Sequence, residues 1–502
     1  MTATQRYGQA GDARRRFRAR TSARLVVLAS ALLLAACGDI TRFGGGTVSH
    51  APASKPTRVT AAPPAGAERE HERILASYGG VYEDPKLESL IARTVDRLVA
   101  SSDRPDLSYK VTILNSAAVN AFALPTGQLY ITRGLIALAN DTSELSSVLA
   151  HEMAHVVARH AAIREDQARQ AAVVSRVVND MGTDPELSAL ALARSKLTMA
   201  SFSRSQEFEA DGIGVGMSAR AGFDPYGAVR FLTSMERNAE LRSSRAGIDP
   251  RARDFLSSHP ATPQRVSNAQ SSARQYSAPE NGERDRETYL GALDDMIYGE
   301  DPNEGFVRGR RFLHPKLGFT FTAPDGFTLD NTAQAVIGVR DGSTQAMRFD
   351  VARVPSEQAL GEYLLSGWME GVDKSTVEDV TVNGFPAATA IARGDQWQFR
   401  IYALRFGSDV YRFIFATKQK SAEADRGFRE SVNSFRRLSL AEIQSARPLR
   451  LKVITVQPGD TIESLAHRMA GVDRQLERFR VLNGLDSRSA LKPRDRVKIV
   501  VE

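Results

Sequence analysis

Five consecutive residues, His151-Glu152-Met153-Ala154-His155, have the side chains and the spacing to hold a metal ion on one face of a helix. Residues four apart on a helix have Cβ atoms roughly 5–6 Å apart, so both imidazoles can reach one ion. Glu152 stands where a zinc-binding helix holds a general base beside a bound water. The chain has eight histidines in 502 residues, and an accidental match is expected in about one such chain in a hundred. The motif therefore indicates a zinc metallopeptidase, and the alternative is an amphipathic helix with two surface histidines.

Two histidines leave such a site one protein ligand short, because catalytic zinc commonly has three. His160 follows His155 by five residues, which at ~100° per residue lies well off the ligand face, so we interpret it as structural. The best candidate for the third ligand is Glu207, and Asp211, one helical turn later, could accept the free N–H of a ligating histidine. Glu209 points elsewhere on that helix and is interpreted as a solvated acid. The alternative for this segment is a charged surface helix.

The helix that carries the motif has a clear start signal. Asp141, with Glu144 three residues later, fits a capped N-terminus, and nothing breaks the helical pattern before Ala162. The apolar positions between them indicate a buried helix beside a cleft: Leu145, Val148, Leu149, Val156 and Val157.

Several further segments occur in one order over roughly residues 70–275. They are Asn120 to Gly127, Thr132 to Leu135, the H-E-x-x-H helix, Glu207-x-x-x-Asp211, and His259-Pro260 followed by Arg265. This set resembles the HtpX/BepA/CAAX-prenyl-endopeptidase-type gluzincin metallopeptidases, a Ste-type peptidase family. The resemblance implies His151, His155 and Glu207 as ligands of one Zn²⁺ and Glu152 as the catalytic base. It also implies that His259 approaches the metal and gates or assists catalysis, whereas a His-Pro pair at a helix start has a purely structural alternative.

The N-terminus has the pattern of a targeting segment, with arginines before an apolar run from Leu25 to Leu34. Leu34-Ala35-Ala36-Cys37 resembles a bacterial lipoprotein signal with Cys37 as the lipidated residue, and the alternative is a plain secretory signal. No later stretch approaches the ~18–20 apolar residues that span a bilayer. We therefore expect a lipid-anchored protein on the periplasmic face of the envelope. Gly38, rather than an acid, after Cys37 favours the outer membrane over the inner.

Charge and composition narrow the classes of partner. Residues 1–36 hold seven arginines and one acid, so +6 of the net charge of +7 belongs to a segment that cleavage would remove. Nucleic-acid binding would need a clustered basic face on the folded part, and none is indicated. Residues 37–66, rich in Gly and Pro, are expected to be a flexible tether.

We expect residues 67–300 to form a mainly helical metallopeptidase domain with a small edge-strand hairpin. An edge strand could hold an extended peptide through main-chain hydrogen bonds. The expected elements are a helix opened by Asp84-Pro85, a strand from Lys110 to Leu114, a hairpin of Ala121–Leu124 and Gln128–Thr132, and a helix from Asp224-Pro225 after Gly222.

Residues 305–440 are expected to form an antiparallel α+β domain to which we assign no chemistry. Alternating apolar residues flank Gly407-Ser408, which marks a hairpin, and Phe428, Val432 and Phe435 have helical spacing. The segment from Leu317 to Pro324 resembles the opening of PsbP-like domains.

Residues 452–502 resemble a LysM module, a βααβ unit that binds N-acetylglucosamine-containing glycans. The resemblance rests on Val456 to Thr461, Leu465-Ala466, Leu482 to Leu485 and Leu491 to Asp495. The departure from the pattern is an arginine-rich middle with Arg474, Arg478 and Arg480. A module that only packs on the rest of the chain is the alternative.

Together these patterns predict a multidomain α+β zinc endopeptidase of the cell envelope. By the resemblance, its partners would be misfolded or misassembled envelope proteins as substrates, the membrane through the lipid, and peptidoglycan through the LysM-like module. The competing functions are a non-enzymatic envelope or outer-membrane assembly factor and a peptidoglycan-binding scaffold.

Overall fold

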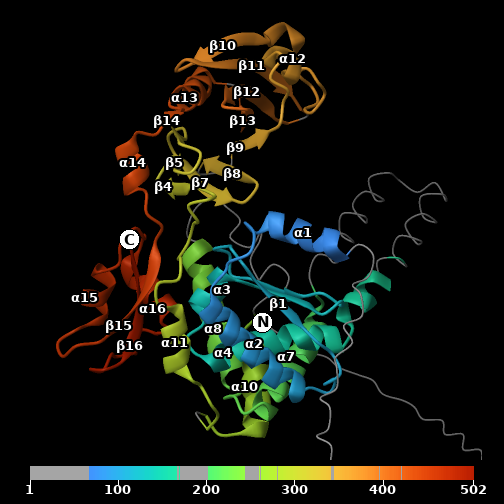
Figure 1. Ribbon diagram of the computed structural model, residues 1–502, viewed down its shortest axis with the longest axis vertical. Coiled ribbons are helices and arrows are strands. Elements are labelled where there is room, and N and C mark those ends of the chain that lie inside the picture. Colours follow the sequence, from blue (N-terminus) through green and yellow to red (C-terminus); the bar gives the residue numbers. More distant parts are fainter. Residues whose placement is uncertain are drawn as a thin grey trace, which may run out of the picture. The chain divides into compact units, whose positions relative to one another are not determined.

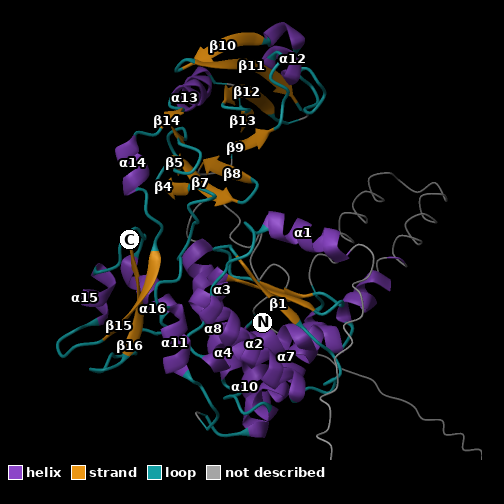
Figure 2. Cartoon of the chain, viewed as in Figure 1, coloured by secondary structure: helices purple, strands orange, loops and turns teal. Residues whose placement is uncertain are grey.

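The computed structural model describes residues 67–166, 169, 202–243, 259, 262–279, 281–340, 344–394, 396–419 and 421–502. The predicted signal segment, Cys37 and the tether lie outside the described residues. The described residues belong to one unit, Ala62–Glu502. It contains a helical region, a strand-rich region and a small βααβ module, so the multidomain α+β prediction is confirmed at that level (Figures 1 and 2). Among the described helices, none is both long and apolar enough to cross a membrane.

The helical region is built around α4 (Thr142–Val157), which is buried along most of its length. As predicted, Asp141 caps it: its side chain accepts a hydrogen bond from the backbone N–H of Glu144 at 2.9 Å. The helix ends earlier than expected, at Val157, because Arg159 adopts a left-handed conformation with a φ of 56°. The other helices are α1 (Ala67–Ser77), α2 (Pro85–Ala100), α3 (Arg133–Leu138), α7 (Arg204–Arg220), α8 (Gly227–Ser243), α10 (Pro263–Tyr276) and α11 (Arg286–Leu293).

Two other predicted helix starts can be compared with the structure. Asp84 caps α2 and Pro85 is its first residue, as predicted. The helix expected from Asp224-Pro225 begins later, at Gly227, because Asp224 first forms a turn in which its side chain accepts from the N–H of Tyr226. Figure 1 shows α4, α7, α8 and α10 gathered together, and α4 contacts both α7 and α8.

A three-stranded sheet accompanies these helices, with the strand order β1-β3-β2. Its strands are β1 (Lys110–Leu114), β2 (Ala121–Ala123) and β3 (Gln128–Thr132). β1 pairs with β3 in parallel, and β2 pairs with β3 antiparallel, which confirms the hairpin. β2 is therefore an edge strand, and it contacts α4.

The strand-rich region has a seven-stranded sheet in the order β10-β11-β12-β13-β9-β8-β7 and a four-stranded sheet in the order β14-β6-β5-β4. The predicted hairpin joins β12 to β13, with Phe406 opposite Asp409 and Gly407 at a φ of 66°. The bounds are β4 (Phe306–Arg308), β5 (Arg311–His314), β6 (Phe319–Thr322), β7 (Phe327–Thr332), β8 (Ala335–Arg340), β9 (Gln345–Ala352), α12 (Leu360–Leu364), η1 (Lys374–Thr376), β10 (Glu378–Val382), β11 (Phe385–Arg393), β12 (Gln398–Phe406), β13 (Asp409–Thr417), α13 (Ala422–Asn433), β14 (Arg436–Arg437) and α14 (Leu440–Ser445). The predicted aromatic positions form its core, including Phe413, Phe415 and Phe428.

The C-terminal module has the predicted βααβ order. It comprises β15 (Arg450–Thr455), α15 (Ile462–His467), α16 (Gln475–Leu482) and β16 (Arg496–Val501). Its apolar residues share one hydrophobic core with the helical region, and α16 contacts α8 and α3. The three arginines of its middle bind groups of the chain itself: Arg474 donates to the carbonyl of Leu241, Arg478 pairs with Asp473, and Arg480 lies 3.6 Å from Glu463.

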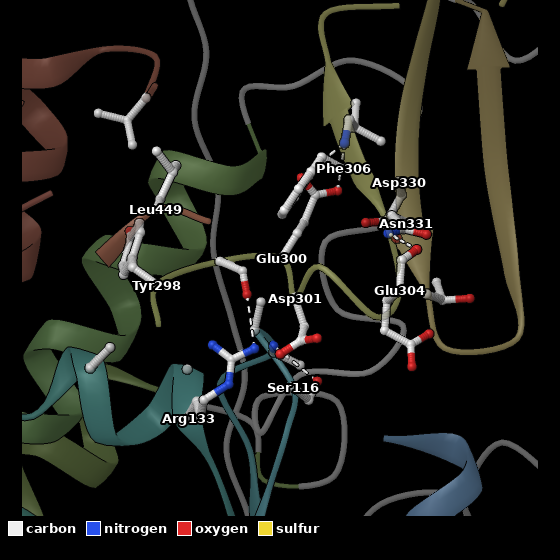
Figure 3. Close-up of a pocket in the computed structure, with 18 of the residues that line it drawn as sticks. Ser116, Arg133, Tyr298, Glu300, Asp301, Glu304, Phe306, Asp330, Asn331 and Leu449 are labelled. Carbon is white, nitrogen blue, oxygen red and sulfur yellow. Dashed lines mark hydrogen bonds between the residues drawn. The ribbon is translucent and has the colours of Figure 1, made fainter. Parts of the chain in front are cut away.

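A cavity of about 800 Å³ is lined in part by Arg133, Glu300 and Asp301 (Figure 3). Its buried polar groups are engaged within the protein. Arg133 donates to Asn115 at 2.7 Å and to the carbonyls of Ile297 and Gly299, and both carboxylate oxygens of Glu300 accept from the N–H of Val307. The lining contains none of the predicted metal ligands, so the cavity is separate from the candidate site.

Candidate metal centre

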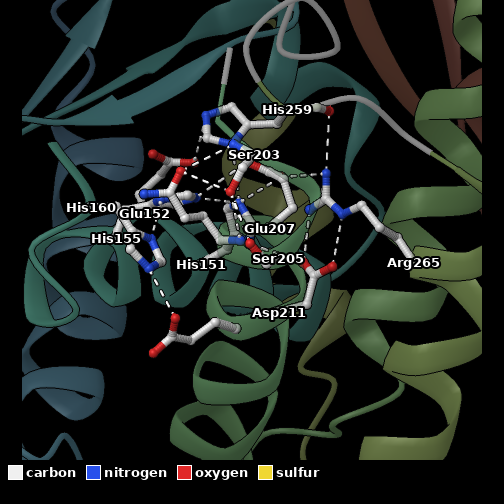
Figure 4. A network of polar contacts seen from close by, with 12 residues as sticks. His151, Glu152, His155, His160, Ser203, Ser205, Glu207, Asp211, His259 and Arg265 are labelled. Atoms are coloured by element: carbon white, nitrogen blue, oxygen red, sulfur yellow. Dashed lines mark hydrogen bonds and ion pairs between the residues drawn. The ribbon is translucent and has the colours of Figure 1, made fainter. Parts of the chain in front are cut away.

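The packing of α4 against α7 brings the predicted ligands together. His151 and His155 lie on α4, and Glu207 lies in the first turn of α7. Ser203 caps α7 in a reciprocal capping box with Gln206, which fixes where that first turn begins. His259 joins them from beyond α8 (Figure 4).

One ligand atom from each of these four residues lies within 4.8 Å of all the others. Nε2 of His151 and Nε2 of His155 are 3.1 Å apart, and each lies 3.6 Å from a carboxylate oxygen of Glu207. Nδ1 of His259 is 2.9 Å from Oε1 of Glu207 and 3.2 Å from Nε2 of His151. All four side chains are buried, so the group is shielded from bulk water.

The charge states favoured by this burial suit a metal ion. Burial lowers the pKa of His151 and of His155, and it lowers the pKa of His259 to about 3, so the neutral rings that a metal ion would need are favoured. Burial also raises the pKa of Glu207, and it raises the pKa of Glu152 well above its usual range, with the Glu207 carboxylate adding to the effect. A divalent cation would add positive charge beside these two carboxylates and favour their ionised forms. Neutral imidazoles with a carboxylate are the donors of catalytic metal sites, so the residues fit a metal ion.

Glu152 lies beside this group and is 2% exposed. Among the described residues, no group donates a hydrogen bond to its Oε1 atom, from which Nε2 of His259 is 3.7 Å away. The backbone N–H of Ala123, on the edge strand β2, bonds to the Glu152 carboxyl group. One carboxylate oxygen is therefore available to a water molecule or a substrate proton.

Asp211 and Arg265 contact the side chains of His151 and Glu207. Oδ1 of Asp211 is 3.0 Å from Nδ1 of His151, which is the contact that the sequence predicted. Arg265, on α10, donates to both carboxylate oxygens of Asp211 at 2.7 Å and lies 2.7 Å from Oε2 of Glu207. Burial alone would raise the pKa of Asp211, but its hydrogen bonds with Arg265 and His151 lower that pKa to about 2. Sequence reasoning noted Arg265 only as part of a motif and missed this role; its spacing after His259 was the available signal.

His160 lies outside the ligand group, as predicted, but its ring does not point away from the site. Its Nδ1 atom is 2.9 Å from Nδ1 of His155. Glu209 is 59% exposed and contacts the other nitrogen of His160, at 3.3 Å. The unbroken helix assumed from the sequence would have carried His160 to another face.

Two glycines on α7 give a matched test of how closely α4 and α7 pack. A Cβ at Gly214 would lie 3.0 Å from the backbone nitrogen of His151, whereas a Cβ at Gly212 would meet nothing within 4 Å. Gly212→Ala should raise the free energy of unfolding by about 0.8 kcal/mol through helix propensity. Gly214→Ala should lower it by about 1–3 kcal/mol, because the helices must separate. Urea unfolding of both variants checks this, and an equal gain in both would contradict it.

Comparison with known proteins agrees with this geometry. The model of Peptidase family M48 matches residues 85–273, and that of the LysM domain matches residues 454–500. The beta-barrel assembly-enhancing protease of Escherichia coli is 31% identical over 212 residues, which are 40% of this chain and 42% of that protein. The mitochondrial metalloendopeptidase OMA1 of Schizosaccharomyces pombe is 29% identical over 207 residues, which are 40% of this chain and 58% of that one. The chain thus covers less than two thirds of either relative.

Among solved structures, the cyanobacterial PsbP protein of Synechocystis matches 28% of this chain and 98% of its own, at 13% identity and a TM-score of 0.22. A likeness at that level carries no argument about the strand-rich region. The residues that match Peptidase family M48 include the buried His and Glu side chains of the candidate metal centre. Residues 85–273 of this chain are a peptidase domain of family M48, and a LysM domain follows at residues 454–500.

Proposed function

We propose that the chain is a zinc-dependent endopeptidase with His151, His155 and Glu207 as the metal ligands and Glu152 as the general base. The observation that carries the proposal is the buried group of ligand atoms within 4.8 Å of one another, with a carboxylate of Glu152 beside it. When bound, the metal would polarise the peptide carbonyl and make a water molecule more acidic. Glu152 would take the proton from the attacking water and pass it to the leaving amine.

The edge strand β2 supports an extended peptide as substrate. In the described part of the chain, β2 pairs with a strand on one side only, and the N–H of Ala123 in it already bonds to Glu152. A peptide lying along β2 would use main-chain hydrogen bonds, which demand little of its side chains. This geometry favours a broad-specificity endopeptidase that acts on unfolded chains.

Metal removal and re-addition test the proposal. The full-length chain, purified in detergent, should hold about one zinc per chain and hydrolyse casein. Dialysis against a chelator should remove both the zinc and the activity, and added Zn²⁺ should restore both. Casein hydrolysis that persists in the metal-free protein would overturn the proposal, as would a chain that binds no zinc and cleaves nothing.

We further propose that His259 is a gate that occupies the fourth ligand position. Its Nδ1 atom lies within the ligand group, and its ring contacts both His155 and Phe202. His259→Ala should raise the basal rate of casein hydrolysis without loss of zinc. If His259 instead stabilised the oxyanion, the rate would fall by about 10²–10³-fold with zinc retained. Peptidase rates and zinc content of the variant distinguish the two roles.

For location and substrates, we propose a lipid anchor at Cys37 and misassembled envelope proteins as clients. The first part is supported by the signal-like sequence before Cys37, and the second by the name of the bacterial relative, which refers to beta-barrel assembly. Cys37→Ala should move the protein from the membrane fraction to the soluble fraction, because one lipid-bearing residue supplies the apolar anchor. Detergent partitioning measures this, and unchanged membrane association would reject the anchor. The LysM domain would add binding to peptidoglycan, for which pull-down with isolated sacculi is the assay.

A further inference from the structure

A fourth histidine, His160, lies directly behind the ring of His155. α4 ends at Val157, and Arg159 has a φ of 56°, which residues with a long side chain rarely adopt. This reversal places His160 beside His155, with their Nδ1 atoms 2.9 Å apart (Figure 4). His160 is 1% exposed, so its ring nitrogens must find their partners within the protein.

The position of the metal-facing nitrogen decides where the protons lie. Nε2 of His155 faces the ligand group, since it is 3.1 Å from Nε2 of His151 and 3.6 Å from Oε1 of Glu207. A neutral imidazole that offers Nε2 to a metal carries its proton on Nδ1. That proton can only be donated to His160 if Nδ1 of His160 is an acceptor. The remaining proton of His160 then sits on Nε2, which lies 3.3 Å from Oε2 of Glu209.

The two ligating histidines are therefore supported in different ways. His151 has a direct carboxylate partner, Asp211, which is buried and clamped by Arg265. His155 instead has the imidazole of His160 as its partner, and the carboxylate of the exposed residue Glu209 lies on the far side of that ring. Phe202 lies against the ring of His155, with centroids 4.0 Å apart, and limits its rotation on that side.

We infer that His160 is a positioning residue for His155, and that Glu209 in turn fixes the tautomer of His160. The hydrogen bonds run in one direction, from His155 to His160 to Glu209, and they keep Nε2 of His155 unprotonated and aimed at the metal. Partners of this kind typically change metal affinity by about 10–100-fold when they are removed. The inference rests on the proposed metal site.

Two amide substitutions test the inference with little difference in size or polarity. In His160→Asn the side-chain oxygen can take the place of Nδ1 and still accept from His155. In His160→Gln the amide reaches the place of Nε2, towards Glu209, and leaves the Nδ1–H of His155 without its acceptor. We expect His160→Gln to bind Zn²⁺ about 10–100-fold more weakly than wild type, with His160→Asn closer to wild type. Glu209→Leu should weaken binding less than His160→Gln, since Glu209 acts one step further from the metal.

The measurement is Zn²⁺ affinity of the full-length chain by competition with a chelator. Absorption spectra of the Co²⁺-loaded protein serve as a second readout of ligand geometry. Urea unfolding of the metal-free variants shows whether each folds. If His160 were purely structural, the substitutions would change the free energy of unfolding, but His160→Asn and His160→Gln would bind zinc equally well. Equal zinc affinities for His160→Asn and His160→Gln would overturn the inference.

His155→Ala separates this inference from the proposed function. If His155→Ala binds zinc as wild type does, the proposed metal site is wrong. If His155→Ala loses zinc while the two His160 variants bind it alike, the metal site stands and the positioning role fails.

Discussion

Glu152→Gln is expected to abolish measurable peptide hydrolysis while leaving the metal in place. Glutamine keeps the size of the side chain and can still accept from the N–H of Ala123. It cannot take a proton from water, and loss of a general base costs about 10²–10⁴-fold in rate. Glu152 is not one of the four ligand residues, so zinc content should match that of wild type.

Casein hydrolysis and zinc content are measured together on the full-length variant. Glu72→Gln makes the same chemical change on α1 at an exposed position, and it should leave both quantities unaltered. A Glu152→Gln rate within tenfold of wild type would mean that another group is the base. Loss of zinc from this variant would instead place Glu152 among the ligands.

Lys498→Met is expected to produce the largest loss of stability outside the metal site. Lys498 lies on β16 of the LysM domain and is 0% exposed. Its Nζ atom donates to the carbonyls of Ala137 and Ala139, each at 2.7 Å. Ala137 lies in the last turn of α3, and Ala139 is its C-cap, two residues before Asp141, the N-cap of α4. The substitution leaves buried acceptors without a donor, which should lower the free energy of unfolding by about 3 kcal/mol.

Lys452→Met is the matched control, because Lys452 lies on the neighbouring strand β15 and its Nζ atom is 2.8 Å from Asp294. That side chain is 50% exposed, so the pair should contribute less than about 1 kcal/mol. Urea unfolding followed by far-UV circular dichroism compares the two. Equal losses would show that Lys498 does not tie the LysM domain to the end of α3, just before the helix that carries His151 and His155.

Most helix starts and hairpins could be predicted from residues that lie within a few positions of one another. The caps at Asp84 and Asp141 and the hairpin at Gly407 all appear where the sequence predicted them. Each depends on hydrogen bonds or backbone angles inside one turn, so the local sequence contains the whole cause. The βααβ order of the LysM domain was instead predicted from the resemblance of residues 452–502 to that module, and the structure has the same order.

The helix ends were predicted less well. The pattern gave no reason for α4 to stop before Ala162, yet it ends at Val157, and the helix expected from Asp224 starts at Gly227. Arg159 is not a residue that favours a left-handed conformation, so tertiary contacts such as that of His160 with His155 must stabilise it. Such contacts leave no periodic trace in the sequence.

The sequence by itself determined the chemistry that is available: two histidines and an acid at helical spacing, with a distant glutamate and histidine as candidates. Only the tertiary structure decided which distant groups share one site. Arg265 reaches Glu207 and Asp211 because α10 packs against α7, and α4 approaches α7 closely where Gly214 lacks a Cβ. His160 stands behind His155 because the chain turns at Arg159. Spacing along a chain constrains neighbours within one helix, but the distance between two helices depends on how their side chains interlock.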